Sequence, residues 1–351
     1  MAYVLSELNR SGLPPLLQGI EKEEQWSEKL SHIRAVWLDY IGGLPARPAV
    51  DLRVHSSSKR AGYTQLHISY SAALGDRITA YLLLPDKLEA TRPAGTTMAD
   101  GYPAVLALHP TIDQGKDDIA LPTGRENRRY ALELVQRGYV VLAPDALTAG
   151  ERISPGYPAF HTGPFYEQYP EWTIVAKNIS DHMQGLDVLC SLDYVNPKAI
   201  GAIGHSFGGY NSYFLAGMDR RVRAVVSSCG FSPFTNDPEP DHWTYRAYPY
   251  THIPKIAADL HVDRVPFEFH EIVALCAPVP SFHYAGQEDH IFPHWKAVGE
   301  GMLELSKLYR WLGREERFRS ILGSGSHDFP EEIRLLAYRF LDHWLKGNRD
   351  A

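Results

Sequence analysis

The stretch GAIGHSFGGY, residues 201–210, decides the fold class of this chain. It contains Gly-x-Ser-x-Gly at residues 204–208, directly after the apolar run 199–204 and directly before a helical pattern. A strand, a sharp turn and a helix in this order form a nucleophile elbow, which exposes a serine oxygen at the edge of a sheet. We therefore predict Ser206 as a nucleophile. The alternative is a tight glycine turn with no catalytic role.

Strands alternate with helices on both sides of this motif. The runs AVLALH (104–109) and YVVLA (139–143) are almost entirely apolar, as expected of strands buried on both faces. Further strands are predicted at 64–70, 78–84, 199–204, 223–228, 280–285 and 318–322, and helices at 18–40, 126–137, 172–194, from 207 onward, 294–310 and 330–346. This alternation predicts an α/β fold, with a mostly parallel, doubly wound sheet flanked by helices.

The 351 residues exceed what such a sheet and its helices require. We expect residues 1–60 to form an N-terminal helical extension and residues 61–351 to form one catalytic domain. Two segments, 151–171 and 231–278, are rich in Pro, His and aromatic residues and are weakly periodic. Long irregular segments in a compact domain commonly act as lids or binding loops. The alternative is a surface excursion with a small core of its own.

A serine nucleophile needs a base, and the base needs an acid that orients it. Asp289 follows the predicted strand 280–285, and His327 follows the predicted strand 318–322. Catalytic groups of open α/β sheets gather at the carboxyl ends of the strands, so we predict Asp289 as the acid and His327 as the base. Asp145 reaches the same edge, where ion pairing with Arg152 is its more ordinary role. Other acids that could replace Asp289 are Glu288, Asp328, Asp237, Glu239 and Asp241.

Acyl transfer also needs hydrogen-bond donors for the negative charge that develops on the carbonyl oxygen. Each such donor lowers the barrier by roughly 2.7–4 kcal/mol. The backbone amide of Phe207, which follows the nucleophile, is one predicted donor. The other comes from the loop after residues 104–109, where Pro110 has no N–H and Thr111 is the better candidate.

From about residue 60 onward the chain resembles the α/β-hydrolase superfamily, and most of all its dienelactone-hydrolase and acetyl-xylan-esterase-like branch. The matching segments are ITAYLLLP (78–85), AVLALHPT (104–111), GKDD (115–118), RGYVVLAPD (137–145), VNPKAIGAIGHSFGGYNS (195–212), RAVVSSCGFS (223–232) and SHDFP (326–330). The resemblance implies the same roles for Ser206, Asp289, His327 and the amides of Phe207 and Thr111. Dienelactone hydrolases proper use a cysteine where this chain has Ser206, which argues against their particular reaction.

These features predict a cofactor-free serine carboxylesterase whose partner is a small-molecule ester, such as an acetylated sugar or a short acyl or aryl ester. Aromatic residues of the two irregular segments are expected to line the substrate pocket, although packing of a lid would also explain them. They are Tyr157, Phe160, Phe165, Tyr166, Phe231, Phe234, Trp243, Tyr245 and Tyr250. The few Lys and Arg residues in these segments argue against a strongly anionic substrate, with Arg246 as the exception.

Two other classes of function are compatible with these residues. A serine peptidase or amidase of the prolyl-oligopeptidase type shares the elbow and the order Ser, Asp, His. It would have to lack the usual propeller, because about 100 residues cannot build blades of roughly 40 residues each. A binding or scaffold protein that retains the elbow is the third reading, and the intact set of three residues argues against it.

Charge and cysteine content limit the partners and the compartment. The formal net charge is −7, from 35 Lys and Arg against 42 Asp and Glu, which argues against nucleic acid as a partner. Cys190, Cys229 and Cys276 show no metal-binding or disulfide spacing, as expected of reduced thiols in a cytoplasmic protein.

Membrane and metal binding are not expected either. No signal peptide and no apolar run of 18 residues is evident, so we expect neither secretion nor a membrane span. His290 and His294 could share a helix face, but without a third ligand we predict no metal. Homo-oligomerisation is left open.

Overall fold

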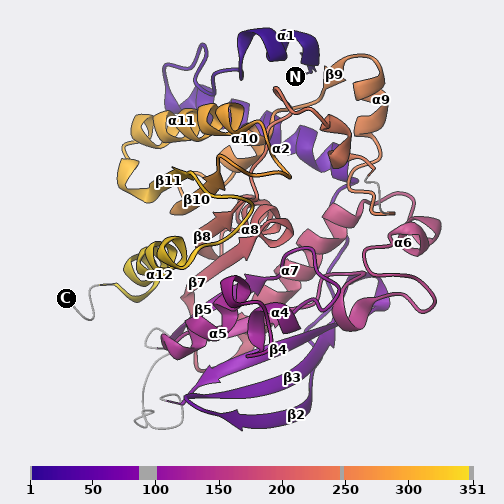
Figure 1. The fold of residues 1–351 in the computed structure, drawn as a ribbon, viewed down its shortest axis with the longest axis vertical. Coiled ribbons are helices and arrows are strands. Elements are labelled where there is room, and N and C mark those ends of the chain that lie inside the picture. Colours follow the sequence, from indigo (N-terminus) through magenta and orange to yellow (C-terminus); the bar gives the residue numbers. More distant parts are fainter. Residues whose placement is uncertain (1, 87–100, 246–248, 348–351) are drawn as a thin grey trace.

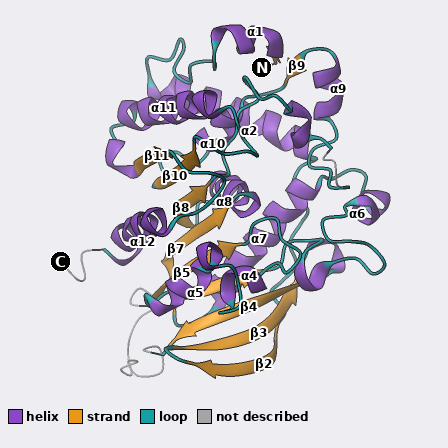
Figure 2. Ribbon diagram, viewed as in Figure 1, coloured by secondary structure: helices purple, strands orange, loops and turns teal. Residues whose placement is uncertain are grey.

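A nine-stranded sheet forms the centre of the computed structural model, which describes residues 2–86, 101–245 and 249–347 (Figures 1 and 2). Its strands are β2 (Leu52–Arg60), β3 (Tyr63–Ser71), β4 (Arg77–Pro85), β5 (Tyr102–Leu108), β6 (Val140–Pro144), β7 (Val195–His205), β8 (Val222–Ser228), β10 (Ser281–Gly286) and β11 (Phe318–Gly323). The spatial order is β11-β10-β8-β7-β5-β6-β4-β3-β2. Neighbours from β11 to β6 pair in parallel, whereas β4, β3 and β2 are antiparallel. The predicted fold class is confirmed.

Helices cover both faces of this sheet. Their bounds are α1 (Leu5–Ser11), α2 (Glu23–Ile41), α4 (Asp117–Ala120), α5 (Tyr130–Gln136), α6 (Gly163–Gln168), α7 (Ile174–Ser191), α8 (Phe207–Met218), α9 (Ile256–His261), α10 (Phe269–Ala274), α11 (Trp295–Trp311) and α12 (Glu331–Lys346). Neighbouring strand residues such as Val105 and Leu106 belong to different hydrophobic clusters, because successive side chains of a strand point to opposite faces. One cluster includes residues of α2, α7, α8 and α11, and the other includes residues of α5 and α12.

The N-terminal segment is less purely helical than predicted. The expected helix at 18–40 is α2, but Leu52–Arg60 forms the edge strand β2 and pairs with β3. The sheet therefore begins before the predicted boundary at residue 60. Both faces of β2 are largely exposed, and its sequence LRVHSSSKR lacks the alternation by which strands are recognised. The helix predicted at 126–137 begins later, at Tyr130, after a short 3₁₀ turn.

The N-terminus lies against the irregular segment 231–278. The short strand β1 (Tyr3–Val4) pairs antiparallel with β9 (Arg264–Val265), and the two lie together at the top of Figure 1. The hydroxyl of Tyr3 donates to Glu271 Oε1 at 2.8 Å. Segments about 260 residues apart in the sequence thus lie side by side. Across the residues that the structure describes, no helix is both long and apolar enough to cross a membrane.

Candidate active site

Ser206 lies in a sharp turn between β7 and α8. Its backbone has φ 54° and ψ −118°, a conformation that a non-glycine residue adopts only when its surroundings enforce it. A Cβ at Gly204 would lie 2.1 Å from the carbonyl carbon of Gly208, and a Cβ at Gly208 would lie 2.0 Å from the oxygen of Leu108. The two glycines of the motif are therefore required by the close approach of backbone on both sides of the serine.

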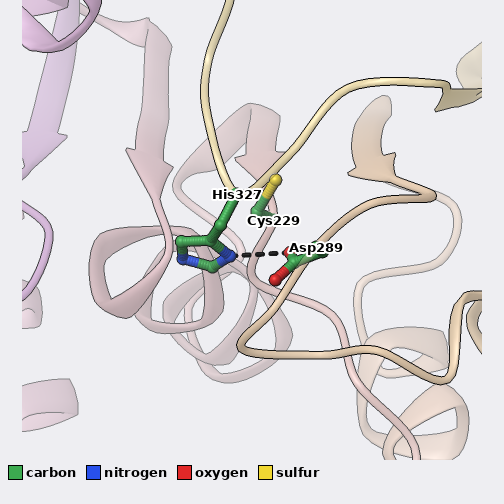
Figure 3. Close-up of side chains that lie close together, drawn as sticks. All are labelled: Cys229, Asp289 and His327. Carbon is green, nitrogen blue, oxygen red and sulfur yellow. Dashed lines mark hydrogen bonds and ion pairs between the residues drawn. The ribbon is translucent and has the colours of Figure 1, made fainter.

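A continuous chain of hydrogen bonds leads away from Ser206. Its Oγ lies 2.8 Å from His327 Nε2, and His327 Nδ1 lies 2.6 Å from Asp289 Oδ2. Figure 3 shows the ring nitrogen directed at the carboxylate. The other oxygen, Asp289 Oδ1, accepts the backbone amides of Ile291 at 2.8 Å and Phe292 at 3.0 Å. This geometry permits the ring to take a proton from the serine while Asp289 keeps Nδ1 protonated.

Electrostatics favour an ionised Asp289 and a neutral His205 beside the serine. Burial by itself would raise the pKa of Asp289. The hydrogen bond and the attraction of His327 outweigh burial and hold this pKa below its ordinary value. Burial lowers the pKa of His205 far below its ordinary value, and its Nδ1 lies 2.9 Å from Ser228 Oγ. A carboxylate is therefore available to orient His327.

The other candidate acids do not bond to the ring of His327. Glu288 is exposed, and the carboxylate of Asp328 is held by Arg128 and by Asn127 Nδ2 at 2.7 Å. Asp237 lies 3.3 Å from His242 Nδ1. Asp289 is the one whose carboxylate meets the ring of His327.

Asp145 holds the loop that carries Thr111. Its carboxylate accepts the backbone amide of Lys116 at 2.9 Å and Lys116 Nζ at 2.9 Å. Added Cβ atoms at Gly115 and Gly150 would lie 2.2 Å and 2.1 Å from Asp145 Oδ1, so the carboxylate fills the space that these glycines leave. Arg152 donates to the backbone carbonyl of Asp145 at 3.0 Å, and its ion pairs are formed with Asp76 and Asp181 instead.

A cavity of about 390 Å³ opens over Ser206, within the range of small-molecule sites. Phe207, one predicted donor, begins α8, and the first amides of a helix have no partner within it. Thr111, the other predicted donor, also borders the cavity. The lining residues are Pro110, Thr111, Arg125, Arg128, His205, Ser206, Phe207, Tyr210, His290, Ile291 and His327.

Among the described residues, none of the nine aromatic side chains predicted for the pocket lines this cavity. Phe160 packs edge-on against Phe207, with ring centroids 5.7 Å apart, and Trp243 stacks on Phe269 at 3.9 Å. Burial of large apolar rings against the body of the protein explains these positions. The buried ones are Phe160, Phe165, Phe231, Phe234, Trp243 and Tyr250; Tyr166 is partly buried, and Tyr157 and Tyr245 are exposed. Arg246 lies outside the described residues.

The basic side of the cavity was not predicted from the sequence. Arg125 and Arg128 come from the segment TGRENRR, residues 123–129, between β5 and α5. The signal was present, because this segment follows the strand whose carboxyl end carries Thr111 and so must return near the same edge of the sheet. His290 and Ile291, which follow Asp289, were also not predicted to line the pocket.

Cys229 lies beside Asp289 and His327 (Figure 3). One ligand atom from each of the three lies within 4.8 Å of the others, the spacing of a candidate metal cluster. Burial, and next the charge of Asp289, raise the pKa of the Cys229 thiol, and its Sγ donates to the carbonyl of Asp328 at 3.4 Å. His327 and Asp289 bond to each other, His327 Nε2 faces Ser206, and the thiol donates to a carbonyl, so the three side chains are engaged in hydrogen bonds rather than directed at a common metal position.

The chain has the fold of the α/β-hydrolases, and the comparisons support the class of serine hydrolases. The profile of the prolyl oligopeptidase family matches residues 128–299. The chain is 26% identical over 281 residues to YtaP of Bacillus subtilis, whose name describes it only as a hydrolase, covering 77% of this chain and 84% of YtaP. It is 31% identical over 104 residues to dipeptidyl-peptidase 5 of Porphyromonas gingivalis, covering 29% of this chain and 14% of that protein.

Solved structures of similar fold include esterases. The glucuronoyl esterase from Solibacter usitatus has a TM-score of 0.68 at 18% identity, with 94% of this chain and 97% of that chain covered. A Bacteroides fragilis structure described as an acetyl xylan esterase has a TM-score of 0.60 at 18% identity, with 85% of this chain and 75% of that chain covered. At this level of identity the likeness concerns the fold.

Proposed function

We propose that this protein is a serine carboxylesterase in which Ser206, His327 and Asp289 form a catalytic triad. The observation that carries the proposal is the chain of hydrogen bonds from Ser206 Oγ through His327 to Asp289, at the floor of a cavity of ligand size. The esterase folds among the similar structures support it. All the groups that this chemistry needs are protein side chains and amides, so no cofactor takes part.

The reaction has two halves. Ser206 Oγ attacks the ester carbonyl carbon while its proton passes to His327 Nε2, and the amides of Phe207 and Thr111 stabilise the oxyanion. The tetrahedral intermediate then collapses, and His327 returns the proton to the departing alcohol. Water attacks the resulting acyl-enzyme with the same histidine as base, which releases the acid and restores Ser206.

A second candidate is a peptidase or amidase with the same triad, favoured by the match to the prolyl oligopeptidase family and the partial match to a dipeptidyl-peptidase. An enzyme that removes residues from a peptide N-terminus needs carboxylates to hold the substrate amine. Within the part of the chain that the structure describes, no Asp or Glu lines the cavity. Glu151 forms ion pairs with Lys116 and, at 2.9 Å, with His67. The esterase is therefore the better-supported proposal.

The test compares 4-nitrophenyl esters and acetylated sugars with aminoacyl anilides on wild type and Ser206→Ala. We expect wild type to hydrolyse the esters and Ser206→Ala to lose this activity. A fluorophosphonate probe should phosphonylate Ser206 in wild type with loss of fluoride, a mass increase equal to the probe less HF, which reports the nucleophile independently of substrate choice. Preferential turnover of anilides would favour the peptidase, and ester activity that survives Ser206→Ala would overturn the mechanism.

Ser232 offers a matched control. It is a buried serine whose Oγ lies 3.0 Å from His294 Nε2, with Asp237 Oδ1 3.8 Å from His294 Nδ1. Ser232 has a histidine and an acid nearby but does not line the cavity. Ser232→Ala should keep both ester turnover and labelling by the probe.

A further inference from the structure

The cavity over Ser206 is asymmetric in charge. Two arginines, Arg125 and Arg128, line it, and no Asp or Glu lines it among the residues that the structure describes. The acids that neutralise these arginines, Asp118 and Asp328, are absent from the lining and bind the guanidinium groups from other sides. The cavity is therefore bordered by the positive ends of two ion pairs.

Arg125 is held in place but retains a free donor. Its Nε and Nη2 form a bidentate pair with Asp118, at 3.0 Å and 2.8 Å, and the side chain of Asp118 is only 5% exposed. The remaining nitrogen, Nη1, has no bonding partner among the described residues, and the Arg125 side chain is 49% exposed. A guanidinium fixed on one edge by a buried carboxylate can present its other edge to a ligand at a small cost in side-chain entropy.

Arg128 is more deeply buried and is also incompletely bonded. Its side chain is 9% exposed, and it bonds to Asp328 and to the carbonyls of Asn127 at 3.1 Å and His327 at 3.4 Å. Its Nε is buried and has no partner within the described part of the chain. Because this nitrogen is closed off from solvent, it does not itself face the cavity, and Arg128 contributes the positive charge of its guanidinium to the cavity wall.

We propose that the preferred substrate is an ester that carries a carboxylate, which Arg125 and Arg128 bind while Ser206 attacks the ester carbonyl. This inference rests on the proposed esterase function and adds the substrate class. It reverses the expectation from the aromatic-rich segments, whose few basic residues argued against a strongly anionic substrate. The arginines come from the 123–129 segment instead, and planar guanidinium groups match the geometry of a carboxylate.

The test measures kcat/KM for matched pairs of charged and neutral esters. One arm places the carboxylate on the acyl part, with the 4-nitrophenyl monoester of glutaric acid against 4-nitrophenyl pentanoate. The other arm places it on the alcohol part, with 4-acetoxybenzoate against its methyl ester. In the arm that matches the natural substrate, the charged ester should be preferred about 10-fold or more, and added NaCl should reduce this preference.

Variants of Arg125 and Asp118 then test whether the arginine side of the cavity causes the preference for charged esters. Arg125→Gln combined with Asp118→Asn removes the cation without leaving a buried carboxylate unpaired. This double variant should lower the charged-to-neutral ratio of kcat/KM about 10-fold or more, and comparison with wild type cancels the intrinsic reactivity of each ester. Asp118→Asn alone keeps the guanidinium and removes its counter-ion, so the same ratio should rise.

Arg129→Gln is the matched control. Arg129 lies on the same segment and donates to the carbonyl of Pro122 at 3.2 Å, but it does not line the cavity. Arg129→Gln should leave kcat/KM unchanged for both the charged and the neutral ester of each pair. Equal use of charged and neutral esters by wild type, or a ratio that stays the same in the double variant, would overturn the inference while the esterase function stands. Failure to hydrolyse any ester would instead overturn the proposed function.

Discussion

Asp289→Asn should reduce kcat for ester hydrolysis about 10⁴-fold, because it places the His327 proton on the wrong nitrogen. Asp289 Oδ1 accepts two backbone amides, from Ile291 and Phe292, so in the variant this position must be occupied by the amide oxygen. The amide NH₂ then takes the position of Oδ2, 2.6 Å from His327 Nδ1, and can only donate.

A histidine that accepts at Nδ1 carries its proton at Nε2. It would then donate to Ser206 Oγ across the 2.8 Å contact and could not remove the serine proton. The expected loss corresponds to about 5 kcal/mol in the activation free energy, at 1.36 kcal/mol for each factor of ten. The fold should be little affected, since the amide oxygen keeps both backbone hydrogen bonds.

The assay is steady-state hydrolysis of 4-nitrophenyl acetate at neutral pH, with thermal denaturation to establish that the variant is folded. Glu288→Gln is the matched control, because Glu288 is an exposed neighbour that does not contact His327; it should stay within about twofold of wild type. A folded Asp289→Asn enzyme that keeps more than about a tenth of the wild-type kcat would refute the reasoning, because a wrong tautomer cannot sustain that rate.

Two further substitutions test packing and pH dependence. Gly208→Ala places a Cβ 2.0 Å from the backbone oxygen of Leu108 and should lower the free energy of unfolding by about 3 kcal/mol or more. Gly299→Ala, whose Cβ meets only the end of a leucine side chain at 3.3 Å, should be tolerated. Equal urea midpoints for the two variants would contradict this. Burial lowers the pKa of His283 to about 4, below its value near 6.5 in the unfolded chain, so protons favour unfolding as the pH falls from about 6.5 towards 4. His283→Leu should reduce the pH dependence of the free energy of unfolding near pH 5 by about 1.2 kcal/mol per pH unit; identical slopes in urea titrations of the two proteins would exclude this role.

The parts of the fold that could be predicted are those whose burial appears in local sequence. Strands such as β5 and β6 are buried on both faces and form continuous apolar runs, which is why their positions were predicted closely. The edge strand β2 is exposed on both faces and forms only because β3 offers unpaired backbone groups along its edge. Such a strand has no local pattern to recognise.

The candidate site also has a part that could be predicted from the sequence and a part that could not. The positions of Ser206, Asp289 and His327 could be argued from the sequence because each directly follows a recognisable strand, and parallel strands end at one edge. The residues that line the cavity could not be argued from the sequence, because the lining depends on which side chains of an irregular segment point toward the cavity. The buried aromatic residues of 231–278 pack against one another, against α8 and against α2, and this burial keeps them out of the cavity.

The sequence by itself determined the class of fold and the three residues that the proposed chemistry needs, since strand periodicity and the Gly-x-Ser-x-Gly spacing are local properties of the chain. Only the tertiary structure decided which side chains border the cavity. Arg125 lies 81 residues before Ser206 in the chain, and it reaches the same cavity because Asp118 holds its guanidinium by a bidentate pair. Contacts between such distant segments depend on packing and charge pairing in three dimensions, which a linear pattern does not contain.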